Sequence, residues 1–266
     1  MVDSPADFHR LDSRLRLRGT LALQTALHVG AGKGSDGVDM PVLRDVEGYP
    51  FIPGASLKGV LRSTLESLVR ALEPSRDQGL WACNPLEDEP GAPDVACGVY
   101  AKGERRGSVD VTGHCAICRL FGSRLVGSHV RISDALAKRR KGPPPIEHRD
   151  GVAIDRDRKV VHGGQKYDFE VVSPGTEFEL EMFVENPRPW LMGLLIVGLD
   201  QIADGFSALG GFTSRGLGRA TLQWDEVVRF TARDLLEGKG PTTLSKDDFA
   251  RERDGWRDAL AQKARP

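Results

Sequence analysis

The chain has 266 residues, of which 39% are hydrophobic and 28% are charged, a balance that suits a folded protein of one large domain or two small ones. Its net charge of −1 excludes a general electrostatic attraction to nucleic acid. The N-terminal segment is polar and no apolar run is long enough to span a membrane, so we expect a cytoplasmic protein.

A strand with one buried and one polar face is predicted from Arg14 to Val29. Five leucines and Val29 share one parity, whereas arginines, Thr20, Gln24 and His28 share the other. Alternation with a period of two residues is typical of a half-buried strand. We therefore expect a polar, basic face that carries His28 near the end of the strand.

A glycine-rich loop, Gly30 to Val38, follows this strand. Its G-x-G-x-x-G spacing resembles a dinucleotide fingerprint, but an extended segment with Pro41 follows where that fingerprint requires a helix. The glycines would still let backbone N–H groups approach a phosphate. Asp39 ends the loop, and its chemistry alone leaves open whether it forms a turn or acts in catalysis.

A helix is predicted to open at Pro53-Gly54-Ala55-Ser56, after a turn near Glu47-Gly48. Its leucines, Leu57, Leu61, Leu65, Leu68 and Leu72, have helical spacing. Lys58 and Arg62 share a polar face, so together with Ser56 they could hold a phosphate at the positive end of the helix. Ser56 could equally be an ordinary helix cap.

The chain contains four cysteines in one stretch, with the spacing C-x13-C-x17-C-x2-C: Cys83, Cys97, Cys115 and Cys118. Periodicity fades from Glu73 to His114, which indicates an insertion that is not held by a core of its own. Four thiolates suit tetrahedral Zn²⁺, and His114 could replace one of them. Four independent buried thiols are the alternative. A zinc ion with four protein ligands has no open position for catalysis, so such a site would be structural.

The middle of the chain is basic: residues 101–160 hold 14 Lys or Arg against 7 Asp or Glu, a track that a neutral total conceals. Within it, Val130 to Ile132 is strand-like. Lys138 to Lys141 and three prolines predict an extended basic loop. The charged, glycine-interrupted segment from Gly151 to Lys166 predicts a protruding loop or hairpin.

The last third of the chain alternates strand and helix. Strands are predicted at Thr176–Val184 and Ala220–Trp224, with an apolar helix from Trp190 to Phe206 between them. A second glycine loop, Gly210 to Arg219, contains Arg215 and could wrap a phosphate backbone or simply connect helix to strand. The tail after Phe230 is expected to be peripheral. This order predicts an α+β, ferredoxin-like sheet with helices on one side.

Seven short segments together resemble the RAMP (repeat-associated mysterious protein) superfamily, and in particular the backbone subunits of type III CRISPR effectors. They occur in family order between Leu15 and Leu222: Thr25–Gly30, Gly37–Asp45, Ile52–Arg62, Cys118–Gly122, Val130–Ala135, Ala153–Arg156 and Leu209–Arg219. The resemblance implies an RRM-like palm over residues 1–230, with a zinc-type insertion at 73–118 and a thumb at 140–172, followed by a peripheral tail at 231–266.

The same resemblance implies a function. Such subunits polymerise along a guide crRNA, contact other effector subunits, and use the thumb to displace one nucleotide of the target RNA at regular intervals. Asp39 matches the family's catalytic aspartate, so the implied reaction is endonucleolytic cleavage with a divalent cation, Mg²⁺ or Mn²⁺. RNA contacts are implied for His28, Ser56, Lys58, Arg62, Arg156, Arg158, Lys159 and Arg215.

Two alternatives remain open from the sequence. The chain could be a non-catalytic scaffold of the same complex, in which Asp39 only shapes its loop. It could also be a stand-alone endoribonuclease that processes guide precursors, with His28 as its acid or base.

Overall fold

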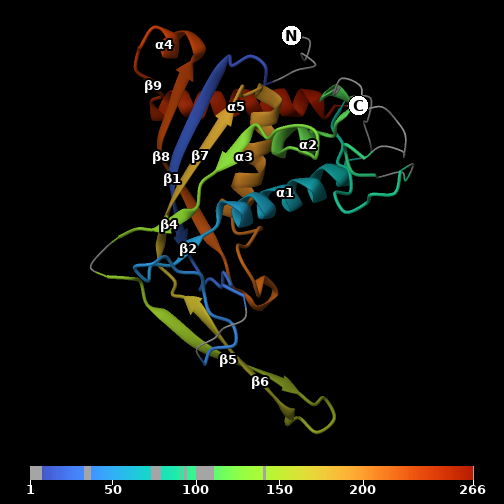
Figure 1. Ribbon diagram of the computed structural model, residues 1–266, viewed down its shortest axis with the longest axis vertical. Helices are drawn as coiled ribbons and strands as arrows, with labels where there is room; N and C mark the ends of the chain where they lie inside the picture. The colour runs from blue at the N-terminus through green and yellow to red at the C-terminus, as the bar shows by residue number, and fades with distance from the viewer. Residues whose placement is uncertain are drawn as a thin grey trace.

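The main feature of the fold is an antiparallel sheet. The structure, a computed structural model, describes residues 8–32, 37–72, 79–90, 92, 95–99, 111–139 and 142–265. Within these residues the strands are ordered β2 (Phe51–Ile52), β4 (Ala135–Ala137), β7 (Glu177–Glu185), β1 (Ser13–Leu23), β8 (Ala220–Thr231) and β9 (Thr242–Thr243), and β3 (Val130–Ile132) also pairs with β7 (Figure 1).

The described helices are α1 (Gly54–Ala71), α2 (Ala116–Phe121), α3 (Pro189–Ala203), α4 (Ala232–Leu236) and α5 (Lys246–Lys263). Helix α3 packs against α1, α5 and β8, and all of them contribute side chains to one hydrophobic core. An α+β fold with an antiparallel sheet, as predicted, is therefore confirmed. None of the described helices is both long and apolar enough to cross a membrane.

Strand β1 shows the predicted alternation on its buried side but not on its polar side. Leu15, Leu17 and Leu21 are almost completely buried. On the other face each arginine pairs with a glutamate of a neighbouring strand: Arg14 with Glu185 at 2.6 Å, Arg16 with Glu226 at 2.9 Å and Arg18 with Glu181 at 2.7 Å. The expectation of a basic face is therefore wrong, because strands β7 and β8 supply the compensating charges.

Strand β8 is longer than the predicted Ala220–Trp224. Arg18 lies opposite Glu226 whereas Gly19 lies opposite Trp224, so Asp225 is an extra residue in β8. Such a bulge interrupts the period-two alternation, which explains why the sequence pattern ends early.

Helix α1 begins after Pro53, and no side chain caps it. Ser56 is exposed, so its interpretation as a cap is wrong. The predicted positions Leu57, Leu61 and Leu65 are buried. Leu68 and Leu72 are instead exposed, near the end of the helix that points away from the strands (Figure 1).

The C-terminal segment, expected to be peripheral, contributes to the core. Helix α5 lies along α3, and Phe249 and Trp256 are both buried. They are seven residues apart, so they share one face of a helix that is otherwise highly charged. Gly193 of α3 permits this close packing, because a Cβ there would lie 2.2 Å from the backbone oxygen of Trp256.

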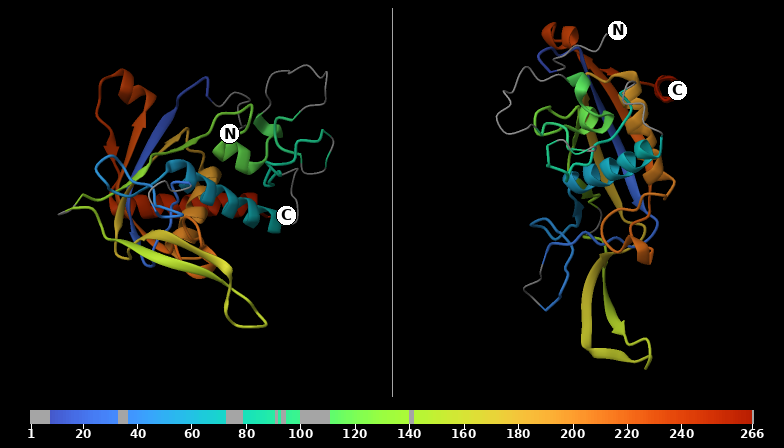
Figure 2. Two further views of the ribbon diagram at one scale, coloured as in Figure 1. Left: turned by 60° about the horizontal axis from the view of Figure 1, so that its bottom comes forward. Right: turned by 90° about the vertical axis from the view of Figure 1, so that its right-hand side faces the viewer.

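The predicted hairpin is confirmed and is longer than expected. Strands β5 (Ile146–Ile154) and β6 (Val161–Val172) pair antiparallel and project away from the main sheet (Figures 1 and 2). In the preceding basic loop, Lys138 pairs with Glu177 and Arg139 with Asp45 and Glu47. Arg140 and Lys141 lie outside the described residues, as do Lys33 to Asp36 of the first glycine loop.

Candidate functional site

His28 lies at the base of the hairpin, beside Gly30 of the first glycine loop and Gly211 of the second. After β1 ends at Leu23 the backbone continues as isolated bridges, Leu27 to Val172 of β6 and His28 to Gly211 of the second loop. The backbone N–H of Gly211 donates to the carbonyl oxygen of His28 at 2.8 Å. A Cβ at Gly210, whose φ is +74°, would lie 2.2 Å from that same oxygen, so this contact requires glycine.

The side chain of His28 is buried rather than presented on a polar face, so that expectation is wrong. The residue is 7% exposed, and its ring lies beside those of Phe169 and Phe212, with centroids 6.0 and 5.1 Å away. The prediction failed because the strand parity ends with β1. His28 Nδ1 lies 2.7 Å from the carbonyl oxygen of Glu170. A carbonyl oxygen can only accept a hydrogen bond, so Nδ1 carries a proton. In the neutral ring Nε2 is then the acceptor.

Asp39 is exposed and is held against β6 by Asp168. The N–H of Asp39 donates to Asp168 Oδ1 at 2.8 Å, and the N–H of Asp168 donates to Asp39 Oδ2 at 3.0 Å. The next residue, Met40, forms a parallel bridge with Phe169. Donation from the Asp39 amide holds the pKa of Asp168 below its ordinary value. The two carboxylates are therefore neighbours at the base of the hairpin.

Glu170, two residues further along β6, holds the segment that follows Asp39. Its carboxylate is buried, accepts from the N–H of Val42 at 3.0 Å and pairs with Arg44 at 2.6 Å. Sequence analysis missed both Asp168 and Glu170. The available signal was their alternation in the Tyr167–Glu170 stretch, which places both on one side of a strand.

Cationic side chains flank this base. Arg215 of the second glycine loop donates a hydrogen bond to the hydroxyl of Tyr167 and lies 5.0 Å from the ring centre of Phe212. Arg156, Arg158 and Lys159 are exposed in the turn that joins β5 to β6. The structure thus brings Arg215 close to β6 and places the other three at the far end of the hairpin (Figure 2).

Ser56, Lys58 and Arg62 do not join this group. Ser56 is exposed on the first turn of α1. Lys58 donates from Nζ to Ser128 Oγ at 2.9 Å, and its partial burial lowers its pKa. Arg62 donates to Glu66 at 2.9 Å, to the carbonyl of Gly122 at 3.1 Å and to Cys118 Sγ at 3.3 Å, so it faces the cysteines.

The four cysteines converge, as their spacing predicts. Their Sγ atoms lie within 4.8 Å of one another, and none forms a disulfide. The Sγ of Cys83 is 3.6 Å from that of Cys118 and 3.7 Å from that of Cys115. A tetrahedral site with Zn–S bonds near 2.3 Å requires sulfur separations of about 3.8 Å, which these distances approach. The cluster could therefore bind a metal ion.

Local folding explains how the thiols are held. Cys115 is the N-cap of α2, and its Sγ accepts from the N–H of Cys118 at 3.3 Å, while Cys97 Sγ accepts from the N–H of Cys115 at 3.3 Å. Hydrogen bonds from the thiols of Cys115 and Cys118 hold the pKa of Cys83 below its ordinary value. Among the described residues His114 is not part of the converging group.

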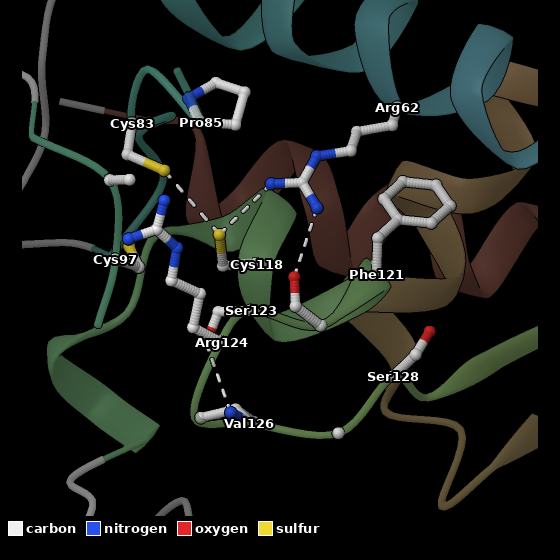
Figure 3. A pocket seen from close by; sticks show the side chains of 13 residues that line it. Arg62, Cys83, Pro85, Cys97, Cys118, Phe121, Ser123, Arg124, Val126 and Ser128 are labelled. Carbon is white, nitrogen blue, oxygen red and sulfur yellow. Dashed lines mark hydrogen bonds between the residues drawn. The ribbon is translucent and has the colours of Figure 1, made fainter. Parts of the chain in front are cut away.

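A cavity of about 520 Å³ opens beside this cluster. Figure 3 shows Arg62 reaching from α1 toward Cys118, with Cys83, Cys97 and Arg124 around it. Arg70, also on α1, donates to the carbonyl of Cys83. Two arginines of α1 thereby join the cysteine-bearing segment to the core.

Comparison with known proteins connects these features to one family. The RAMP superfamily matches residues 20–221. The protein named CRISPR system Cms endoribonuclease Csm3 from Methanocaldococcus jannaschii is 28% identical over 255 residues, 90% of either chain. The protein of the same name from Methanothermobacter thermautotrophicus is 31% identical over 43% of this chain and 35% of the relative. The one from Mycobacterium tuberculosis is 44% identical over 20% of this chain and 24% of the relative.

Proposed function

Because the chain belongs to the RAMP superfamily, we propose that it is a guide-RNA-binding backbone subunit of a type III CRISPR effector complex that also cuts target RNA. The observation that carries this proposal is the exposed carboxylate of Asp39 at the base of a projecting, cation-tipped hairpin. The names of the relatives, CRISPR endoribonucleases, support the same reaction class. Its partners would be guide crRNA, target RNA, further copies of itself and other effector subunits.

The hairpin is the proposed element of RNA recognition. Arg156, Arg158 and Lys159 would bind phosphates, and the exposed Val152 and Ile154 offer apolar surface to a base. If copies of the chain follow one another along a guide, their hairpins recur at a constant spacing. A nucleotide displaced at each hairpin would then be cut at regular intervals.

Cleavage would use the target RNA's own 2′-hydroxyl. Its oxygen attacks the adjacent phosphorus as the P–O5′ bond breaks, and the leaving 5′-oxygen takes a proton from water, giving a 2′,3′-cyclic phosphate and a 5′-hydroxyl. Asp39 would take the 2′-hydroxyl proton or help to hold a divalent cation, Mg²⁺ or Mn²⁺. The Asp39 side chain is exposed, so its carboxylate is accessible for either role. When bound, the cation would stabilise charge on the phosphate oxygens.

Guide contacts are proposed for the remaining cations. Arg215 lies in the glycine loop beside Tyr167, and Ser56 is exposed at the start of α1. Lys58 and Arg62 would have to exchange their present partners, Ser128 and Cys118, to reach a phosphate. His28 would act through the glycine loops, because its Nδ1 is already committed to the Glu170 carbonyl.

For the cysteine cluster we propose structural Zn²⁺. The donor set consists of four thiols and their separations suit a tetrahedral ion, so no position would remain for catalysis. Zinc would hold Cys83 and Cys97 against α2, next to the core residues Leu80 and Ala82.

In the alternative of a non-catalytic scaffold, the chain would have the same place in the complex, but Asp39 would only shape its loop. The alternative of a stand-alone endoribonuclease with His28 as its acid or base is disfavoured, because that ring is buried among aromatic side chains. It predicts that the isolated chain cuts guide precursors without metal.

The test is cleavage by the assembled, guide-loaded complex, comparing wild type with Asp39→Ala, each with and without Mg²⁺ or Mn²⁺. We expect cleavage at regular intervals that requires both Asp39 and metal, with target binding unchanged. If both forms bind target equally and cut it equally, Asp39 is not the catalytic residue. If neither cuts, the chain is a scaffold.

A further inference from the structure

We infer that Asp168 is a positioning residue for Asp39, and that it ties the geometry of the cleavage site to the root of the hairpin. The inference rests on the proposed function and deepens it, since it names the group that orients the catalytic carboxylate.

The first observation is that the two aspartates form a closed pair of hydrogen bonds. Each side chain accepts from the backbone N–H of the other residue, at 2.8 and 3.0 Å. Two such bonds fix both the position of the Asp39 backbone and the rotation of its carboxylate, because Oδ2 accepts from the Asp168 amide. Asp39 lies outside any regular strand or helix, so these two bonds are the side-chain contacts that orient it against β6.

The second observation is the place of Asp168 in the fold. It lies on β6, directly opposite Asp150 of β5, and therefore belongs to the hairpin itself. Glu170 repeats the attachment two residues later through Val42 and Arg44. Residues 39–44 are thus held beside β6 by two of its carboxylates.

These contacts have a chemical consequence. A reacting group displaced by about 1 Å loses roughly 100-fold in rate, so the orientation of Asp39 matters as much as its charge. RNA that grips the hairpin would act on the same strand that holds Asp39. Target binding at the hairpin would therefore also align the Asp39 carboxylate for cleavage.

The distinguishing variants are Asp168→Ala and Asp168→Asn. Alanine removes the acceptor for the Asp39 N–H, whereas asparagine keeps an oxygen at that position and removes only the charge. Asp150→Ala is the matched control: it removes the facing carboxylate of the same hairpin, which pairs with Lys166 at 3.1 Å. All are assayed in the guide-loaded complex at saturating target, over a range of Mn²⁺ concentrations, beside Asp39→Ala.

We expect Asp168→Ala to lower the maximal cleavage rate by about 10- to 100-fold with target affinity unchanged. Asp168→Asn should restore the rate to within about threefold of wild type without shifting the Mn²⁺ concentration for half-maximal rate. Asp150→Ala should cut like wild type.

Full activity of Asp168→Ala would overturn the inference. So would an Asp168→Asn variant as inactive as the alanine variant, or one with a raised Mn²⁺ requirement, since either result makes Asp168 a charge or a metal ligand rather than a hydrogen-bond acceptor. Cleavage by Asp39→Ala would instead refute the proposed function, which separates the two failures.

Discussion

Arg62 Nη2 donates a hydrogen bond to Cys118 Sγ across 3.3 Å, and the same guanidinium bonds the carbonyl of Gly122 and the carboxylate of Glu66. Helix α1 and the cysteine cluster are therefore joined by one side chain. The positive charge opposes the net negative charge that four thiolates around a divalent ion would carry.

Replacing Arg62 with alanine should weaken metal retention. Outer-shell partners of metal ligands contribute about 10- to 100-fold in affinity, so we expect faster loss of zinc to a chelator by that order. The measurement is metal release from the purified chain, followed with a chromophoric chelator. Lys58→Ala is the control, since Lys58 lies one turn earlier and contacts Ser128 instead. Equal release from both variants would contradict the prediction.

Acid should open the pairing of Asp39 with Asp168. The pKa of Asp168 lies below its ordinary value of 3.8 in the folded chain, chiefly because the Asp39 amide donates to it. Because the pKa of Asp168 is lower in the folded chain than in the unfolded chain, its ionised carboxylate stabilises the fold fully at pH values above the unfolded pKa. This stabilisation is lost as the pH falls through the folded pKa. A carboxyl-carbon NMR titration should place the Asp168 midpoint below 3.8. Amide protection at Asp39 that did not fall through that midpoint would argue against the pairing.

Two glycines in the second loop should respond very differently to alanine. Gly216 and Gly218 both have φ of +85°, but a Cβ at Gly218 would lie 1.9 Å from the carbonyl oxygen of Leu209, whereas one at Gly216 meets nothing within 4 Å. Gly216→Ala should cost only the backbone strain, about 1 kcal/mol. Gly218→Ala should cost about 3 kcal/mol or more in the free energy of unfolding. Equal denaturation midpoints for the two variants would show that Gly218 does not approach the carbonyl oxygen of Leu209 so closely.

Helix α5 should be essential for stability. Trp256→Ala removes a buried indole and should lower the free energy of unfolding by about 3 kcal/mol. Asp258→Ala, on an exposed position of the same helix, should change it by no more than about 0.5 kcal/mol. Thermal denaturation of the two variants decides whether the C-terminal segment belongs to the core.

The hairpin cations should set the salt dependence of RNA binding. Changing Arg156 or Arg158 to Gln should reduce the slope of log affinity against log salt by about 0.7 for each phosphate of single-stranded target that the variant no longer neutralises. Arg233→Gln, on α4 at the opposite end of the molecule from the hairpin, should leave the slope unchanged (Figure 1). An unchanged slope in the hairpin variants would remove this element from the RNA interface.

Local patterns in the sequence were sufficient for much of this fold. The alternation of β1 and β7, the apolar helix α3, the hairpin and the convergence of four cysteines all follow from spacing along a short stretch of chain. Short-range periodicity specifies which side of an element is apolar, because apolar burial is decided residue by residue. The segment Gly37–Asp45, whose resemblance to the family made Asp39 a candidate, is also a short stretch of chain.

Other features depended on contacts between distant segments. Nothing near Arg14, Arg16 or Arg18 in the sequence shows that β7 and β8 would neutralise them, and the tail looked peripheral because two aromatic residues among many charges make a weak pattern. Asp168 lies 129 residues from Asp39, so only the path of the chain makes them partners. The sequence by itself determined which side of each regular element is apolar and brought Asp39 and the four cysteines forward as candidates. The tertiary structure decided what each of them faces, because that depends on loops and bulges that periodicity does not encode.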